Sequence, residues 1–366
     1  MRLSSTLSLY VGRHFIAAFL MLLSLFILLI LLFDTVELMR RSASKPHIDF
    51  GMVLEMALLK LPYMCQEIFP FAVLFAGMAC FWRLTRSNEL VVTRGSGVSA
   101  WQFLLPPVTI AAMLGIFQIT TINHIASNTL SRFEQLEAVR FQGSRHLLTL
   151  SGSSIWLRQS NVKGQSVIHA ERVVQYESDI ELNNLVVFMY AGSGSFFMRI
   201  DAKTARLEDG FWHIGDAWIY EPEKPAVYEE AYLLDTDLTL DKIQDSFAPP
   251  ETMSFWDLPG FIHNLESAGF SALRHRLHWH GLLAAPLLMV AMVLIGAAFT
   301  LRHSRRGATS YVIGGGVLTG FALYFFSDVV FALGLSDSIP VTLAAWSPSG
   351  VALLLGLTTL LHLEDG

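Results

Sequence analysis

The stretch FIAAFLMLLSLFILLILLF, Phe15–Phe33, contains no charged side chain. A helix needs about 20 apolar residues to cross a hydrocarbon core of about 30 Å, and this run meets that length. It is too long for the core of a signal peptide and lacks a small-residue cleavage site, so we interpret it as a membrane-spanning helix. Of the 366 residues in the chain, 53% are hydrophobic and only 15% are charged, which excludes an ordinary soluble domain.

Five further apolar runs follow, so we predict six membrane spans. Their approximate ranges are 12–36, 55–83, 100–126, 277–301, 308–333 and 342–362. An even number of spans puts both chain ends on one side of the membrane. Arginines lie before span one, around the loop after span two and in the loop after span four, and the positive-inside rule places these segments in the cytoplasm. These bases are Arg2, Arg13, Arg83, Arg86, Arg94, Arg302, Arg305 and Arg306.

Residues 134–266 differ from the rest of the chain in charge and in period. They contain 21 of the 31 acidic residues and 10 of the 25 basic ones, an acidic balance that argues against a nucleic-acid partner. Short runs bounded by Gly, Asn, Asp and Pro predict successive β-strands. In NNLVVFMY both faces are apolar, which fits an ordinary sandwich core or an open jelly roll whose inner face takes acyl chains.

We therefore expect an α-helical membrane protein with six transmembrane helices, three on each side of an inserted extracytoplasmic, all-β, jelly-roll-like domain. The expected boundaries are 1–133 for the first three spans, 134–266 for the insert and 267–366 for the last three spans.

The loop SNELVVTRGSG, residues 87–97, predicts a short helix between spans two and three. Ser87 or Asn88 is a possible cap, an acid falls in the first turn and two glycines end the helix. Such a helix lies on the membrane or docks in the groove of a partner. Membrane docking would favour a base-rich polar face, so we favour a cytoplasmic protein partner over that reading and over a simple loop cap. The candidate contacts are Arg86, Glu89, Leu90 and Arg94.

The segment ELMRRSASK, residues 37–45, places three bases on the side of the membrane where the positive-inside rule disfavours them. Two adjacent guanidinium groups at this level can clamp phosphates through bidentate hydrogen bonds. Alternatively, they pair with Glu37 along the same helix. Both interpretations remain open for Arg40, Arg41 and Lys45.

Several other polar features lie in the spans. The ionisable residues are Asp34, Glu37, Glu55, Lys60, Glu67 and Asp328, and charges at such depth normally face a bundle interior or a wet cavity. For Asp328, the most isolated of them, we expect structural pairing. Gly316 and Gly320 lie one turn apart in span five and predict a face that another helix can approach closely.

Three histidines at the outer mouth of span four are the nearest approach to a catalytic or metal site. His275, His278 and His280 do not share one helical face, so an interfacial belt of aromatic and basic residues explains them better than zinc. The sequence contains no GxxxxGK[ST], HExxH or GxSxG motif. It therefore predicts no catalytic residue, no metal site and no cofactor in this chain.

Four stretches carry a family resemblance: FDTVELMRR, LPYMCQEIFPFAVLFAGM, RLTRSNELVVTRGSGVSAWQ and LYFFSDVV. With the order of spans and insert, they resemble the lipopolysaccharide-export permease family, the paired LptF and LptG proteins, and the LptG branch more closely. The resemblance implies a permease subunit of an ABC transporter in the bacterial inner membrane, multi-pass and with both termini cytoplasmic. Such a transporter extracts lipopolysaccharide and passes it to a periplasmic bridge.

The resemblance also implies partners and site residues. The partners are a sister permease of the LptF type, two copies of a cytosolic ABC ATPase that uses ATP and Mg, a jelly-roll bridge protein of the LptC type, and lipopolysaccharide. The acid of the family's coupling helix falls on Glu89, and the bases that meet lipid phosphates fall on Arg40 and Arg41. Spans one and five line the route of lipid entry, so we assign Glu37, Gly316, Gly320 and Asp328 to this lateral gate.

Two departures and two rivals accompany the resemblance. Asp34 stands where some relatives carry a further base, and INHIASN lacks the proline usual after span three. A secondary transporter would need an inverted repeat and a midplane site, which the two halves do not share. An enzyme that modifies envelope lipids would need a catalytic group at the outer surface, and the three histidines are the candidate.

Overall fold

The computed structural model describes residues 5–43, 49–95, 97, 99–141, 155–161, 164–176, 179–190, 195–208, 210–222, 224–236, 249–267, 271–301 and 309–365. The chain divides into two compact units. The membrane unit comprises Met1–Ser131, Pro250–Leu258 and Leu273–Gly366, and the β unit comprises Arg132–Pro249 and Pro259–Ala272.

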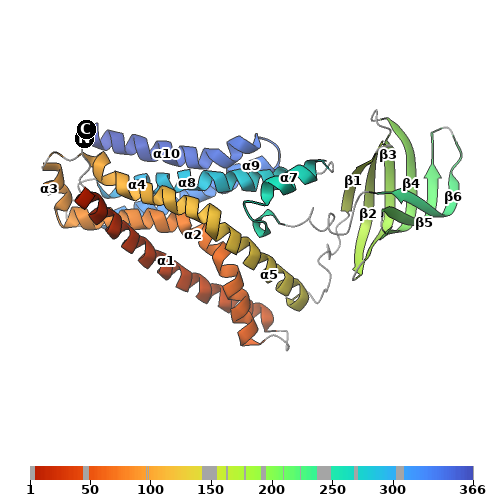
Figure 1. Cartoon of the computed structure of the whole chain (residues 1–366), viewed down its shortest axis with the longest axis horizontal. Coiled ribbons are helices and arrows are strands. Elements are labelled where there is room, and N and C mark those ends of the chain that lie inside the picture. The colour runs from red at the N-terminus through yellow and green to blue at the C-terminus, as the bar shows by residue number, and fades with distance from the viewer. Residues whose placement is uncertain are drawn as a thin grey trace. The chain divides into compact units, whose positions relative to one another are not determined.

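Long helices build the membrane unit (Figure 1). They are α1 (Ser5–Ser42), α2 (Phe50–Arg86), α4 (Ala100–Phe117), α5 (Asn123–Phe141, continuing into the β unit), α8 (Leu273–Thr300), α9 (Thr309–Leu335) and α10 (Val341–Asp365). Between them lie the short helix α3 (Glu89–Gly95), the π-helical turn η1 (Gln118–Ile122) and the 3-10 turn η2 (Pro250–Thr252). Within the described residues six helical segments are long and apolar enough to cross a membrane, which confirms the predicted spans.

Close helix packing centres on α8, which lies against α2, α4 and α10. Gly115 of α4 faces the backbone of Pro286, where an added Cβ would lie 2.5 Å from the Pro286 Cα. Gly296 of α8 approaches α2 as closely, with an added Cβ 2.9 Å from the Leu74 carbonyl oxygen. Small residues therefore bring the helix backbones together, as expected where lipid provides no hydrophobic drive for helix association.

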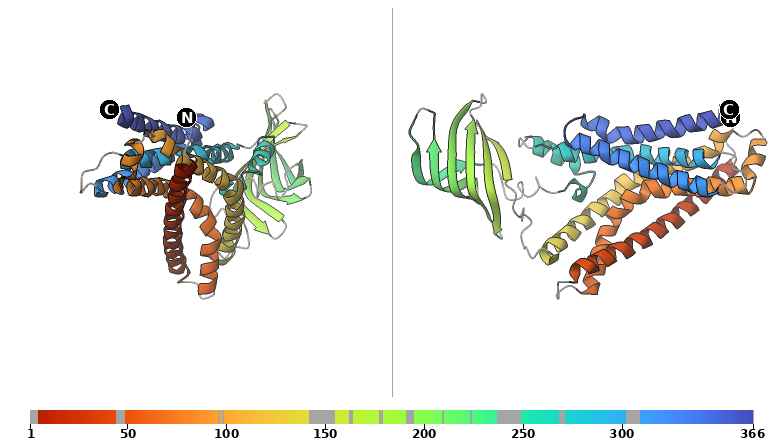
Figure 2. Two further views of the ribbon diagram at one scale, coloured as in Figure 1. Left: turned by 60° about the vertical axis from the view of Figure 1, so that its left-hand side comes forward. Right: turned by 180° about the vertical axis from the view of Figure 1, so that it is seen from behind.

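One end of the helical bundle gathers α3, the start of α1 and the end of α10 (Figures 1 and 2). The end of α1 and the end of α9 lie at the opposite end of the bundle. This arrangement agrees with an even number of crossings.

Within its described residues the β unit contains six antiparallel strands in sequence order. They are β1 (Ile155–Asn161), β2 (Gly164–Tyr176), β3 (Asp179–Tyr190), β4 (Phe196–Glu208), β5 (Phe211–Tyr220) and β6 (Val227–Asp235), and the helix α7 (Leu258–Ser267) belongs to the same unit. The expected all-β insert is thus confirmed. Its described strands are joined as a meander, in which each strand pairs with the next along the chain.

A crease crosses this sheet where the alternation of buried residues reverses. Leu182 and Leu185 are both buried although two residues lie between them, a spacing that puts side chains on opposite faces of a regular strand, and Asn184 has a φ of 51°. Asp216 occupies the corresponding position of β5 with a φ of 54°. The left-handed residues reverse the pleat, so both halves of the sheet keep their apolar side chains on one face.

That apolar face is a packed core. Trp212 has no exposed surface, and Leu185 and Val187 are 2% and 0% exposed. On the opposite face the Arg199 guanidinium lies 5.8 Å from the centre of the Phe188 ring, so an arginine covers part of the second apolar stripe. Of the two sequence interpretations, the buried side chains fit the ordinary core.

Candidate functional site

The short helix predicted after span two is present as α3. Asn88 adopts a φ of 59°, which turns the chain out of α2, and its carbonyl accepts the Val92 N–H at 3.2 Å. The helix begins at Glu89 and ends at Gly95, and Gly97 beyond it has a φ of 86° that glycine adopts at low cost. The sequence signals for the start and the end of this helix therefore agree with the structure.

Side chains of α3 divide between an anchor and an exposed surface. Leu90 is 8% exposed and belongs to the core of the membrane unit, whereas Val92 is 72% exposed. The Glu89 carboxylate lies close enough to the Tyr10 hydroxyl of α1 to accept its hydrogen bond. At the end of α2, the Arg86 guanidinium lies 5.1 Å from the Trp82 ring centre. Leu90, predicted as a partner contact, thus holds α3 against the bundle, and Arg94 lies in the last turn of the same helix.

At the far end of α1 an ion pair involves one of the predicted phosphate ligands. Arg40 donates two hydrogen bonds to Glu37, each of 2.9 Å, and both side chains are exposed. Such a surface pair contributes only about 0–1 kcal/mol, so a phosphate can compete for the guanidinium. Arg41 is also exposed. Lys45 lies outside the described residues, as do Arg2, Arg302, Arg305 and Arg306.

Asp34 forms a second ion pair, between α1 and α2. Its Oδ1 lies 2.7 Å from the Lys60 Nζ, and the two side chains are only 14% and 23% exposed. A positive charge is thus present at this level, but α2 supplies it. Beside this pair an apolar cavity of about 380 Å³ lies between the two helices. Its lining residues are Phe26, Leu29, Ile30, Phe33, Asp34, Glu37, Met64 and Ile68.

The glycines of α9 mark its approach to α2. An added Cβ at Gly316 would overlap the end of the Met78 side chain, and one at Gly320 would lie 3.3 Å from Leu74 Cδ2. The predicted close-packing face is therefore directed at span two of the same chain. The opposite face of α9 is open, with Leu318 and Phe325 about equally exposed at 72% and 70%.

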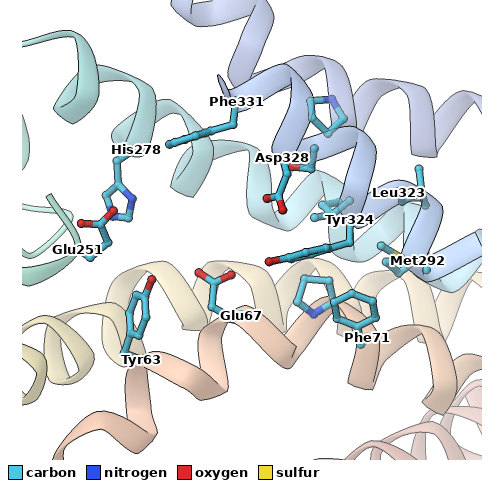
Figure 3. A pocket seen from close by; sticks show the side chains of 15 residues that line it. Tyr63, Glu67, Phe71, Glu251, His278, Met292, Leu323, Tyr324, Asp328 and Phe331 are labelled. Carbon is cyan, nitrogen blue, oxygen red and sulfur yellow. The ribbon is translucent and has the colours of Figure 1, made fainter. Parts of the chain in front are cut away.

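Asp328 lies in a cavity of about 370 Å³ that α2, η2, α8, α9 and α10 enclose (Figure 3). Glu67 of α2 and Asp328 of α9 point toward one another across it, and Glu251 of η2 lies near its other end. Among the described residues the nearest charged neighbour of Asp328 is another acid, Glu67, so the structural pairing expected for Asp328 stays a prediction. Glu251 lies 3.5 Å from the guanidinium of Arg274, which compensates that carboxylate in part.

The three histidines of α8 have separate surroundings. His278 lines the acidic cavity, while His280 makes an edge contact with Trp279, their ring centres 5.1 Å apart. Trp279 in turn stacks on Phe255 at 6.2 Å. Among the described residues no three His, Cys, Asp or Glu side chains converge as metal ligands. The aromatic contacts agree with an interfacial belt.

A polar junction that the sequence analysis missed links α2 to the third span. Pro70 has no N–H, so the carbonyl of Gln66 one turn earlier loses its helical donor. The Gln118 side chain of η1 donates to that carbonyl at 3.3 Å, and the Asn123 amide donates to the Gln66 side chain, also at 3.3 Å. Gln66, Gln118 and Asn123 are all at least 92% buried. The signal in the sequence is a glutamine four residues before a proline inside a span.

The same junction holds the segment that returns from the β-strands. The backbone N–H of Phe255 donates to the Asn123 Oδ1 at 2.7 Å, and the Trp256 indole donates to the Thr120 carbonyl at 3.5 Å. A π-helical turn, Gln118–Ile122, immediately precedes α5, and the segment INHIASN, which lacks the expected proline, continues from the last residue of that turn through the first turns of the α-helix. Such π-helical turns are frequent at functional sites.

The fold and these sites define a polytopic membrane protein with an inserted β domain and a short helix at the end of the bundle that holds the chain termini. The chain belongs to the lipopolysaccharide export system permease LptF/LptG family, whose family model matches residues 9–362. It is 22% identical over 359 residues to the lipopolysaccharide export system permease protein LptG of Escherichia coli K12, covering 96% of this chain and 97% of that protein. The LptG protein of Escherichia coli O6:H1 matches to the same extent.

Proposed function

We propose that this chain is the permease subunit of an ABC transporter that extracts lipopolysaccharide from the bacterial inner membrane and passes it to a periplasmic bridge. The observation that carries the proposal is the family match over residues 9–362, which includes both halves of the membrane unit and the insert. In this proposal the chain hydrolyses no ATP; a cytosolic partner in two copies uses ATP and Mg. The other partners are a sister permease of the LptF type and a bridge protein of the LptC type.

The geometry of α3 supports mechanical coupling to the ATPase. Leu90 fastens the helix to the bundle while Val92 faces outward, so a partner that holds α3 also moves the ends of α1 and α2. Because α2 has 37 residues, it is about 55 Å long at 1.5 Å per residue, and it passes both outer cavities on its way from α3. Nucleotide must favour the collapsed over the open state, since equal binding to both would shift nothing.

The outer end of α1 supports lipid capture. Arg40 and Arg41 are exposed there, and Arg40 is held only by a surface ion pair. Of the six spans, α1 and α9 bury the smallest share of their residues within the chain. Both helices are therefore available to lipid and to a sister permease, and we place the lateral gate along them.

Purification of the full-length chain from gently solubilised membranes tests the proposal. We expect a cytosolic ATPase and a second six-span protein to accompany it. Glu89→Lys should leave the chain inserted but abolish ATPase association, because the acid at the start of α3 becomes a repulsive base. Glu55→Lys, a charge reversal on an exposed residue of α2, is the matched control. Unchanged ATPase recovery with Glu89→Lys contradicts the docking role.

Photo-crosslinking to lipopolysaccharide at the outer end of α1 tests lipid capture separately. Replacement of Arg40 and Arg41 by glutamate should reduce crosslinking at neighbouring positions and leave the ATPase bound. Equal crosslinking in both proteins contradicts the assignment. Export by the isolated chain in vesicles, with no ATPase present, would favour the secondary-transporter alternative. Loss of export after alanine replacement of the three histidines would favour the enzyme alternative.

A further inference from the structure

The acidic cavity between α2 and α9 has a composition that neither ATPase coupling nor phosphate binding explains. Among the described residues no lysine or arginine lines it, and the ionisable residues there are Glu67, Glu251, Asp328, His278 and two tyrosines. Phosphate groups would be repelled by this set of carboxylates. The cavity therefore suits a ligand of the opposite charge.

The depth of the cavity places it near the outer interface of the membrane. Glu67 lies about 28 Å along α2 from Arg86, at 1.5 Å per residue, and the hydrocarbon core is about 30 Å thick. Glu251 belongs to the turn η2, which precedes α7 and lies outside the spans. Headgroups of the outer leaflet and soluble molecules outside the membrane both reach this level.

Two facing carboxylates at such depth are costly unless a cation or a shared proton accompanies them. Arg274 lies beside Glu251 at 3.5 Å, but no ion pair with a described residue involves Glu67 or Asp328. His278 lines the same cavity. Its Nε2 atom is buried and has no hydrogen-bond partner among the described residues. In a neutral ring whose proton is on Nδ1, that nitrogen can accept a hydrogen bond.

The remaining lining favours an organic ammonium group over a coordinated metal ion. Aromatic rings of Tyr63, Phe71, Tyr324 and Phe331 surround the carboxylates (Figure 3). Cations bind over such rings, and an alkylammonium offers both N–H donors and apolar surface. A metal ion would instead need several converging ligands, and the described residues contain no group of three.

We propose that the cavity between Glu67 and Asp328 binds a primary ammonium group, carried either by an amine-bearing lipid headgroup or by a small soluble amine. The two carboxylates accept the ammonium hydrogens, and the aromatic rings enclose the carbon next to the nitrogen. The site is independent of the proposed lipopolysaccharide export, because it depends only on these side chains.

Native mass spectrometry of the full-length chain tests the lipid source. The chain is released from nanodiscs that contain phosphatidylethanolamine and phosphatidylcholine in equal amounts. The ethanolamine headgroup carries N–H groups, and the choline headgroup carries none. We expect preferential retention of phosphatidylethanolamine, reduced about tenfold or more in Glu67→Gln with Asp328→Asn, since hydrogen bonds to charged groups are the strong ones. Glu55→Gln, which removes an exposed carboxylate of the same helix, should retain the preference.

Titration with putrescine in detergent, followed by thermal unfolding, tests the soluble source. Stabilisation that the double replacement abolishes, without lipid preference, supports a soluble amine; lipid preference without stabilisation supports a headgroup. Both neutral replacements relieve the repulsion between the two acids, so the variant should unfold at the wild-type temperature or above it, and Asp328→Asn alone provides a second test. Absence of both effects, or effects equal in wild type and variant, overturns the proposal and favours a shared proton.

Discussion

Replacement of Gln118 by leucine should destabilise the protein by about 1 kcal/mol, because it leaves the carbonyl that Pro70 frees without a donor. A buried acceptor without a partner costs about 1–3 kcal/mol, whereas hydrogen bonds between membrane helices average about 0.6 kcal/mol and reach about 1.7. The bond to the Gln66 carbonyl measures 3.3 Å, longer than the usual 2.9–3.0 Å, which favours the lower values. The Gln118 Oε1 is itself buried without a partner among the described residues, so its loss offsets part of the cost.

The test is a double-mutant cycle with Pro70→Ala. Alanine restores the N–H that α2 lacks, so the Gln66 carbonyl regains a helical donor and Gln118→Leu should then cost little. The free energy of unfolding of the four proteins, measured in mixed micelles, should give a coupling of about 1 kcal/mol. An equal cost of Gln118→Leu in both backgrounds would refute the reasoning.

Three further predictions concern packing and charge. Asp34→Ala should destabilise by about 3 kcal/mol, because it removes the carboxylate that lies 2.7 Å from the partly buried Lys60 ammonium, whereas Asp34→Leu with Lys60→Met should lose less than 1.5 kcal/mol; a double variant as unstable as the single one would contradict this. Gly115→Ala should cost about 1–3 kcal/mol, since the new methyl group meets the backbone of α8, while Gly281→Ala, with open space around it, should leave the melting temperature within a degree or two. Hydrogen bonds, chiefly from Tyr228 and also from Lys203, hold the pKa of Asp216 below its ordinary value. The stabilisation is therefore complete above the unfolded pKa of about 3.9 and is lost as the pH falls through the folded pKa. Tryptophan fluorescence can follow acid unfolding of wild type and of Asp216→Asn. As the pH falls from neutral, wild type should lose more of its neutral-pH stability than Asp216→Asn, and equal losses would exclude the contribution.

Span number, insert position and the bounds of α3 follow from the sequence because each depends on a local rule. Charge-free length predicts a membrane helix, and an acid after a polar cap followed by glycine predicts a short one. Leu90 shows where local rules end. Its type marks it as apolar, but only the packing of α3 on the bundle decides whether it faces a partner or the core.

The candidate sites depend on contacts between distant parts of the chain, and sequence reasoning reached them in part. Arg40 and Glu37 lie one helical turn apart, and the sequence predicts their pairing as an alternative to phosphate binding. The pairing of Asp34 with Lys60, and the meeting of Glu67 with Asp328, require helices to lie side by side in a particular rotation. A single sequence records the charges but not that rotation.

The hydrogen bonds from Phe255 and Trp256 to the third span also constrain how the insert is carried. The third span leads into the β-strands, and the segment that follows the strands is hydrogen-bonded to that span through Phe255 and Trp256. The chain passes between the two units four times, and these bonds couple the segments next to the first two passages, so a force on one of these segments is shared with the other.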